Sequence, residues 1–121
     1  MLILLVFSSC EEKEATPKQR YLALGDSYTI GESVREEERW PVQLVQALEK
    51  EAIVLDSPQI IAQTGWTTSD LKQGIDATAL DYPYDWVSLL IGVNNQYQGK
   101  SRIEFREEFE QLVSQAILFT G

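Results

Sequence analysis

Three residues with side chains or backbone groups suited to chemistry each follow a short apolar run. The residues are Ser27, Gly65 and Asn94, and the runs before them span 21–25, 60–62 and 86–91. A serine hydroxyl becomes a nucleophile once a neighbouring base takes its proton. Glycine lets the backbone approach a ligand closely, and an asparagine carboxamide offers two hydrogen-bond donors without charge. These residue types are suited to a ligand site if the fold brings them together.

The apolar runs are typical of short buried strands, because each is bounded by polar or turn-forming residues. If the strands are parallel, their carboxyl ends meet at one edge of the sheet, where open α/β sheets bind ligands. Ser27, Gly65 and Asn94 are then expected to share that edge. Each of them alone is more typical of an ordinary turn or helix cap, so the prediction of a site depends on their joint arrangement.

Composition limits the classes of protein that the chain can represent. Its 121 residues suffice for one domain, and 44% of them are hydrophobic, as in globular proteins. The net charge of −9 disfavours nucleic acid as a partner. The chain has no histidine, which excludes a histidine metal site or a Ser-His pair within these residues. We predict no metal and no cofactor, and the oligomeric state is not predictable.

The amino-terminal residues resemble a bacterial lipoprotein signal. Residues 1–7 are apolar, and Ser8 and Ser9 directly precede the single cysteine, Cys10. A short apolar segment followed by small residues is typical of secretion signals. The resemblance implies lipid attachment at Cys10 and a place in the bacterial cell envelope, lipid-anchored, periplasmic or secreted, with a flexible tether to residue 20. The alternative is an N-terminal strand or helix with a free thiol.

Strands and helices alternate along the rest of the chain, 21–121. Strands are expected at 21–25, 59–62 and 86–91, with a brief edge strand at 53–55. A loop, with or without a helical turn, covers 26–39. Helices follow Pro41 to about 50 and Thr67 to Gly74, and the longest helix runs from Ser101 to about Phe119. Thr67 with Asp70, and Ser101 with Glu104, have the spacing of capping boxes. This alternation predicts an α/β fold with a parallel sheet. Because three strands make a thin sheet and the chain stops on a helix, we expect a fragment of a larger domain.

The three blocks together resemble the GDSL, or SGNH, hydrolases. Gly25-Asp26-Ser27-Tyr28-Thr29 matches the first block, Gly65 matches the second, and Asn94 within Gly92-Val93-Asn94-Asn95 matches the third. Asn95 stands where many members have Asp, which affects a supporting hydrogen bond and not the assignment of Asn94. The family's fourth block, D-x-x-H, has no match in these residues.

This resemblance implies a fold, a reaction and a role for each residue. The fold is a three-layer α/β/α arrangement with a flavodoxin-like parallel sheet, here incomplete. The reaction is hydrolysis of small acyl esters through a seryl acyl-enzyme, as in lysophospholipases or carbohydrate deacetylases. Ser27 is the nucleophile, and the oxyanion hole consists of the N–H groups of Ser27 and Gly65 with the Asn94 carboxamide. Without the fourth block, the 121 residues alone are expected to be inactive.

Two other functions remain open from the sequence. The chain could be a non-catalytic, lipid-tethered protein that keeps the pocket without a catalytic histidine. It could also be a flavodoxin-like cofactor binder, although Asp26 would then lie beside the phosphate. Tyr28, Trp66 and Tyr97 are expected either to wall an acyl or sugar pocket or to pack in the core.

Overall fold

The apolar run Tyr-Leu-Ala-Leu-Gly forms the central strand of a parallel sheet. In the computed structural model, which describes residues 17–121, β1 (Tyr21–Gly25) lies between β2 (Gln59–Ala62) and β3 (Trp86–Leu90). Both neighbours pair with it in parallel. Every residue of β1 is buried, as expected for a central strand covered on both faces. The predicted parallel sheet is therefore confirmed.

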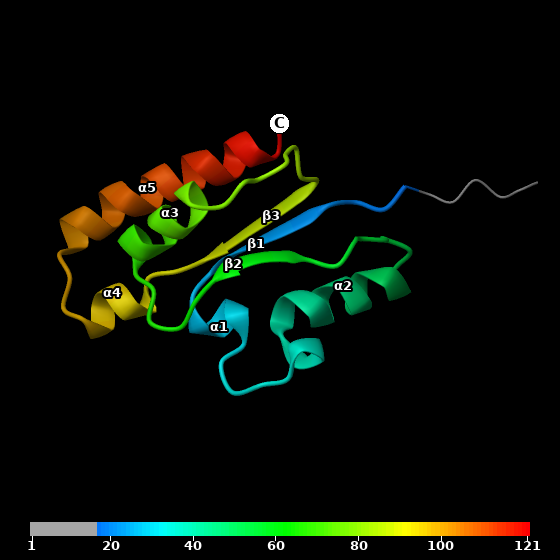
Figure 1. Cartoon of the computed structure of the whole chain (residues 1–121), viewed down its shortest axis with the longest axis horizontal. Coiled ribbons are helices and arrows are strands. Elements are labelled where there is room, and N and C mark those ends of the chain that lie inside the picture. Colours follow the sequence, from blue (N-terminus) through cyan, green and yellow to red (C-terminus); the bar gives the residue numbers. More distant parts are fainter. Residues whose placement is uncertain (1–16) are drawn as a thin grey trace, which may run out of the picture.

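The register of the sheet brings the three strand ends to one level. Gly25, the last residue of β1, lies opposite both Ala62 and Leu90, the last residues of β2 and β3. Figure 1 shows the three strands running toward the same end of the molecule. The residues that follow each strand consequently share one edge of the sheet.

Helices cover both faces of the sheet, which gives three layers. Figure 1 shows α3 (Thr68–Asp76) and α5 (Arg102–Phe119) on one side and α2 (Trp40–Lys50) on the other. Leu22 and Leu24 of β1 pack toward α3 and α5, whereas Tyr21 and Ala23 pack toward α2, because successive side chains of a strand point to opposite faces. With the strand order β2-β1-β3, this is the predicted three-layer, flavodoxin-like α/β fold.

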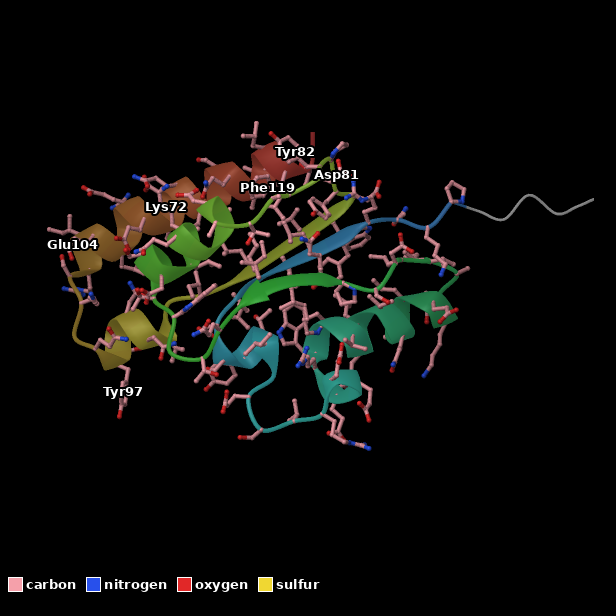
Figure 2. The ribbon with its side chains drawn as sticks, in the orientation of Figure 1. Lys72, Asp81, Tyr82, Tyr97, Glu104 and Phe119 are labelled. Atoms are coloured by element: carbon pink, nitrogen blue, oxygen red, sulfur yellow. The ribbon has the colours of Figure 1, made fainter. Side chains whose placement is uncertain are left out.

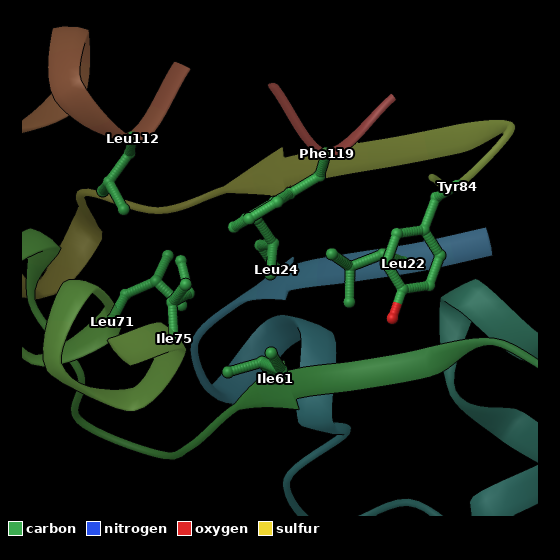
Figure 3. Packing of buried hydrophobic residues seen from close by; sticks show 8 residues of the cluster. All are labelled: Leu22, Leu24, Ile61, Leu71, Ile75, Tyr84, Leu112 and Phe119. Carbon is green, nitrogen blue, oxygen red and sulfur yellow. The ribbon is translucent and has the colours of Figure 1, made fainter. Parts of the chain in front are cut away.

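The larger of the two hydrophobic clusters lies between the sheet and the α3–α5 layer. Figure 3 shows Leu71 of α3 and Leu112 of α5 converging on the side chains of the sheet. The cluster consists of Leu22, Leu24, Ile61, Leu71, Ile75, Tyr84, Leu112 and Phe119. Both helices are thereby held over the strands, so that their amino-terminal ends have fixed positions relative to the sheet edge.

Helix starts follow the local signals in the sequence. The side chain of Thr67 accepts a hydrogen bond from the N–H of Asp70, and the Asp70 carboxylate accepts one from the Thr67 N–H, so the predicted capping box forms. Ser101 caps α5 by accepting from Ile103 and Glu104. Within the described residues, Glu104 makes no reciprocal bond to Ser101, so only half of that second box forms.

Several predicted details are wrong. Helix α3 does not end at Gly74 but continues to Asp76. Gly74 lies inside the helix because it leaves space for the indole of Trp66. A Cβ at Gly74 would lie 2.3 Å from that ring. The edge strand at 53–55 reduces to a single bridge between Gln19 and Leu55. The helical turn that the sequence leaves open for 26–39 does form, as α1 (Ser27–Ile30) and η1 (Glu36–Glu38), whereas α4 (Val93–Tyr97) replaces an expected turn.

Residues 1–16 lie outside the described part of the chain. The predictions for Cys10 and for most of the tether concern those residues and stay predictions. From residue 17 onward, no helix combines the length and the apolar character required to cross a membrane.

Candidate active site

Ser27 is the first residue of α1, directly after the buried Asp26 that caps this helix. The Asp26 carboxylate accepts a hydrogen bond of 3.0 Å from the N–H of Tyr28. Asp26 therefore occupies the place at the helix start that a phosphate would need, which disfavours the flavodoxin-like cofactor binder. Among residues 17–121, the N–H of Ser27 has no acceptor and its hydroxyl makes no hydrogen bond.

Gly25 is required by close packing. It belongs to the regular part of β1. A Cβ at this position would lie 2.1 Å from the hydroxyl oxygen of Thr29 and 2.8 Å from the carbonyl oxygen of Leu90. The missing side chain lets α1 fold back against the ends of β1 and β3. This contact determines where Ser27 lies relative to the sheet.

Gly65 is exposed in the loop between β2 and α3 and has a φ of 84°. This left-handed conformation favours glycine over other residues. A Cβ at Gly65 would meet nothing within 4 Å, so the backbone and not the lack of space requires a glycine here. In the described part of the chain its N–H has no acceptor, and it therefore remains free to bind a ligand.

Asn94 lies in α4, which follows β3 immediately. Its Nδ2 donates a 3.0 Å hydrogen bond to the carbonyl oxygen of Trp66. Gln98, the residue that directly follows α4, donates through its Nε2 to the carbonyl oxygen of Gly65 at 3.4 Å. Helix α4 is thus tied to the loop that contains Gly65. Because a carboxamide nitrogen has two protons, one donor of Asn94 remains available.

Asn95 keeps a supporting role although it replaces the expected carboxylate. Its side chain is buried and forms two hydrogen bonds with Thr68, one to the Thr68 N–H (3.0 Å) and one to the Thr68 hydroxyl (2.7 Å). The Thr68 hydroxyl in turn donates to Glu108 Oε2 of α5. Sequence reasoning missed Thr68 and Glu108, because no local pattern connects residues 40 positions apart.

A cavity of about 500 Å³ opens beside Ser27. Its lining includes Tyr28, Gly31, Glu32, Val34, Glu38, Arg39, Trp40, Thr64 and Leu90. The Thr64 hydroxyl donates to Glu32, which connects the loop after β2 to the segment after α1. Hydrogen bonds from Arg35 lower the pKa of Glu38 below its ordinary value. The cavity combines apolar side chains with charged side chains of both signs, Glu32, Glu38 and Arg39.

The three aromatic residues near the blocks have different environments. Tyr28 lines the cavity beside Ser27. Tyr97 is 90% exposed and points away from the molecule in Figure 2, so it does not wall this cavity. Trp66 packs against Gly74 and the main hydrophobic cluster, as the core interpretation predicted.

The fold therefore brings Ser27, Gly65 and Asn94 to the same edge of the sheet. They follow β1, β2 and β3, whose last residues are in register. Figure 1 shows α1, the loop before α3, and α4 gathered at that end. The catalytic roles of these residues stay predictions. Within residues 17–121, no group of three or more histidine, cysteine, aspartate or glutamate side chains is arranged to hold a metal ion.

Residues 23–118 match the model of the GDSL-like Lipase/Acylhydrolase family. This match covers most of the chain and includes Ser27, Gly65 and Asn94. A comparison with curated proteins finds no significant match.

Several solved structures, two of the three described below being esterases, share the fold. AlinE4, a SGNH-hydrolase family esterase, is 23% identical with a TM-score of 0.73, and the alignment covers 84% of this chain and 54% of that one. TesA is 16% identical with a TM-score of 0.75, covering 85% and 57%. The psychrotrophic esterase EstA from Pseudoalteromonas sp. is 20% identical with a TM-score of 0.69, covering 86% and 56%. The chain thus spans little more than half the length of these proteins.

Proposed function

The chain belongs to the GDSL-like lipase/acylhydrolase family, and on this premise we propose that it provides the nucleophile and the oxyanion site of a serine esterase. The observation that carries the proposal is the shared sheet edge, where Ser27, Gly65 and Asn94 follow three strands that end in register. A hydroxyl, a backbone N–H and a carboxamide at one edge of the sheet suit attack on an ester carbonyl and stabilisation of the resulting negative charge.

In the proposed reaction, Ser27 Oγ attacks the carbonyl carbon of the ester while a base takes the hydroxyl proton. The carbonyl π electrons move to oxygen and form a tetrahedral oxyanion. Its collapse breaks the bond to the alcohol oxygen, which receives the proton from the base, and leaves an acyl-serine. Water then releases the acid and restores Ser27. Since these residues contain no histidine, we place the base in the D-x-x-H block of a longer protein.

Three hydrogen-bond donors are available for the oxyanion. The N–H groups of Ser27 and Gly65 have no acceptor within the described residues, and Asn94 has one carboxamide proton left after its bond to Trp66. Donors of this kind typically contribute on the order of 10²–10³ each to the rate. The bond between Asn94 and Trp66 orients the carboxamide before the substrate arrives, so less reorganisation is needed during the reaction.

The cavity beside Ser27 favours a small ester with an apolar acyl group. Tyr28, Val34 and Leu90 provide apolar contacts for such a group. A volume of about 500 Å³ suits a short acyl chain with part of its alcohol. Lysophospholipids and acetylated carbohydrates are both candidate substrate classes.

The first test is the Ser27→Ala variant of the full-length protein. We expect hydrolysis of 4-nitrophenyl acetate to fall by a factor on the order of 10⁴–10⁶, because the nucleophile is lost. The matched control is Ser114→Ala, an exposed serine of α5 that bonds within its own helix. Retained turnover in Ser27→Ala, with the wild-type rate in the control, would refute the proposed nucleophile.

A second candidate is a binding protein that uses the cavity beside Ser27 without catalysis. Such a protein would bind short-chain esters and release them unchanged. Nuclear magnetic resonance titration with ethyl acetate, followed by detection of free acetate, distinguishes binding from hydrolysis.

We further propose that Cys10 carries a lipid that anchors the protein in a bacterial cell envelope. The support is the apolar segment followed by Ser8 and Ser9 directly before this cysteine. In a bacterial host, labelled palmitate is expected to be incorporated into the wild-type protein but not into Cys10→Ser. Equal labelling of the two proteins would place the lipid elsewhere, and labelling of neither would refute the anchor.

A further inference from the structure

Thr68 is the centre of a buried polar cluster that joins three helices beside the candidate site. It is the first residue of α3 and is fully buried. Its N–H donates to Asn95 Oδ1, its hydroxyl oxygen accepts from Asn95 Nδ2, and its hydroxyl proton goes to Glu108 Oε2. Asn95 belongs to α4 and Glu108 to α5. One threonine thus connects α3, α4 and α5.

The chemistry of the groups sets the direction of every bond in this cluster. A backbone N–H can only donate, so the Asn95 atom that faces it is the carbonyl oxygen and the Asn95 NH₂ faces the Thr68 hydroxyl. The hydroxyl oxygen accepts from this NH₂, which leaves its only proton for Glu108. A buried hydroxyl proton without an acceptor is unfavourable, so the carboxylate of Glu108 completes the cluster.

We propose that Glu108 is a positioning residue for the candidate oxyanion site. Glu108 accepts the Thr68 hydroxyl proton and so orients this hydroxyl, whose oxygen accepts a hydrogen bond from Asn95. Asn95 in turn holds α4 in place. The neighbouring Asn94 donates a hydrogen bond to the carbonyl oxygen of Trp66, so both asparagines bind to the segment 66–68. The positioning role rests on the proposed function, whereas the direction of the hydrogen bonds is a property of the folded chain alone.

The proposal requires that, of residues 95 and 108, one donates to the Thr68 hydroxyl and the other accepts its proton. In Asn95→Asp, the new carboxylate accepts both the N–H and the O–H of Thr68 and competes with Glu108 for one proton. Two carboxylates then face a hydroxyl that can satisfy only one of them. In Asn95→Asp/Glu108→Gln, the glutamine turns its NH₂ toward the Thr68 hydroxyl oxygen, and every group again has a partner.

Chemical unfolding of the full-length protein tests this pairing. Asn95→Asp is expected to raise the unfolding equilibrium constant about tenfold or more. Adding Glu108→Gln should recover most of that loss. The control is Glu107→Gln, which removes the same charge from an exposed side chain one residue away on α5. Equal recovery by both substitutions would mean a general charge effect, and recovery by neither would mean that the cluster is not coupled; either result overturns the proposal.

The positioning role is tested through the side-chain amide signals of Asn94 in nitrogen–proton spectra. Glu108→Ala is expected to shift or broaden them, whereas Glu107→Ala leaves them unchanged. Glu108→Gln should preserve them, because its carbonyl oxygen can still accept the Thr68 proton. Unchanged Asn94 signals in Glu108→Ala would overturn the role. Neither measurement uses a substrate, so a protein without esterase activity would refute the proposed function and leave this result intact.

Discussion

At the scale of single residues, two glycines at the site serve different physical purposes. Gly25 leaves room for Thr29 and for the backbone of Leu90, so α1 can lie against the end of the sheet. Gly65 has open space around it and is instead required by its positive φ. Glycine thus builds the site once by packing and once by backbone conformation.

Tyr21 provides a prediction about pH. Burial raises the pKa of its phenol above the ordinary value of 10.0, and the hydrogen bond with Ser88 partly opposes this. Below the ordinary pKa the phenol is neutral in both the folded and the unfolded state, so the stability that Tyr21 contributes is fully present. As the pH rises further, the unfolded phenol ionises before the folded one, so stability is lost up to the raised pKa of the folded state.

We therefore expect Tyr21→Phe to be about 1 kcal/mol less stable than the wild type at pH 7, because one hydrogen bond is lost. The difference should narrow above pH 10, since phenylalanine cannot ionise. Urea unfolding at pH 7 and at pH 10.5 measures both effects. Tyr84, whose pKa burial also raises, is present in both proteins, so the comparison isolates Tyr21. A difference that is constant with pH would contradict the prediction.

At the scale of secondary structure, α3 shows that packing can override helix propensity. Gly74 lies inside this helix, where alanine would normally be more stable by about 1 kcal/mol. The indole of Trp66 occupies the space that the alanine methyl group would need. Overpacking of this kind costs about 1–3 kcal/mol, which exceeds the gain in propensity. The glycine is therefore favourable in this helix despite its low propensity.

Gly74→Ala is accordingly expected to destabilise the full-length protein by about 1 kcal/mol, the difference between these two effects. In a Trp66→Leu background, where the indole is absent, the same substitution should become neutral or stabilising. Thermal unfolding of the four proteins in this cycle measures the change. The same loss with and without the indole would show that Trp66 is not the cause.

At the scale of the whole molecule, two hydrophobic clusters lie on opposite faces of the sheet, and β1 contributes side chains to both. The larger one includes Leu24, which is fully buried, and the smaller one includes Ala23. Several large apolar side chains of β3 and α5 remain exposed, among them Leu90 at 46% and Ile103 at 72%. Stability is therefore concentrated around β1, whereas the surface of α5 contributes little to it.

Leu24→Ala is expected to destabilise the full-length protein by about 2–5 kcal/mol, because it opens a cavity among packed side chains. The control is Ile103→Ala, whose exposed side chain should cost less than about 0.5 kcal/mol. Urea unfolding followed by tryptophan fluorescence measures both. Similar losses in the two variants would contradict the assignment of the core to β1.

The sequence by itself determined the three strands of the parallel sheet, the Thr67 capping box and the edge that collects Ser27, Gly65 and Asn94. These features depend on residues close together in the chain, such as an apolar run before a turn or Thr67 before Asp70. Only the tertiary structure decided why Gly25 and Gly74 are glycines and how Glu108 reaches Thr68, because those contacts join side chains from separate elements. Local patterns cannot specify which side chains meet across a packed interface.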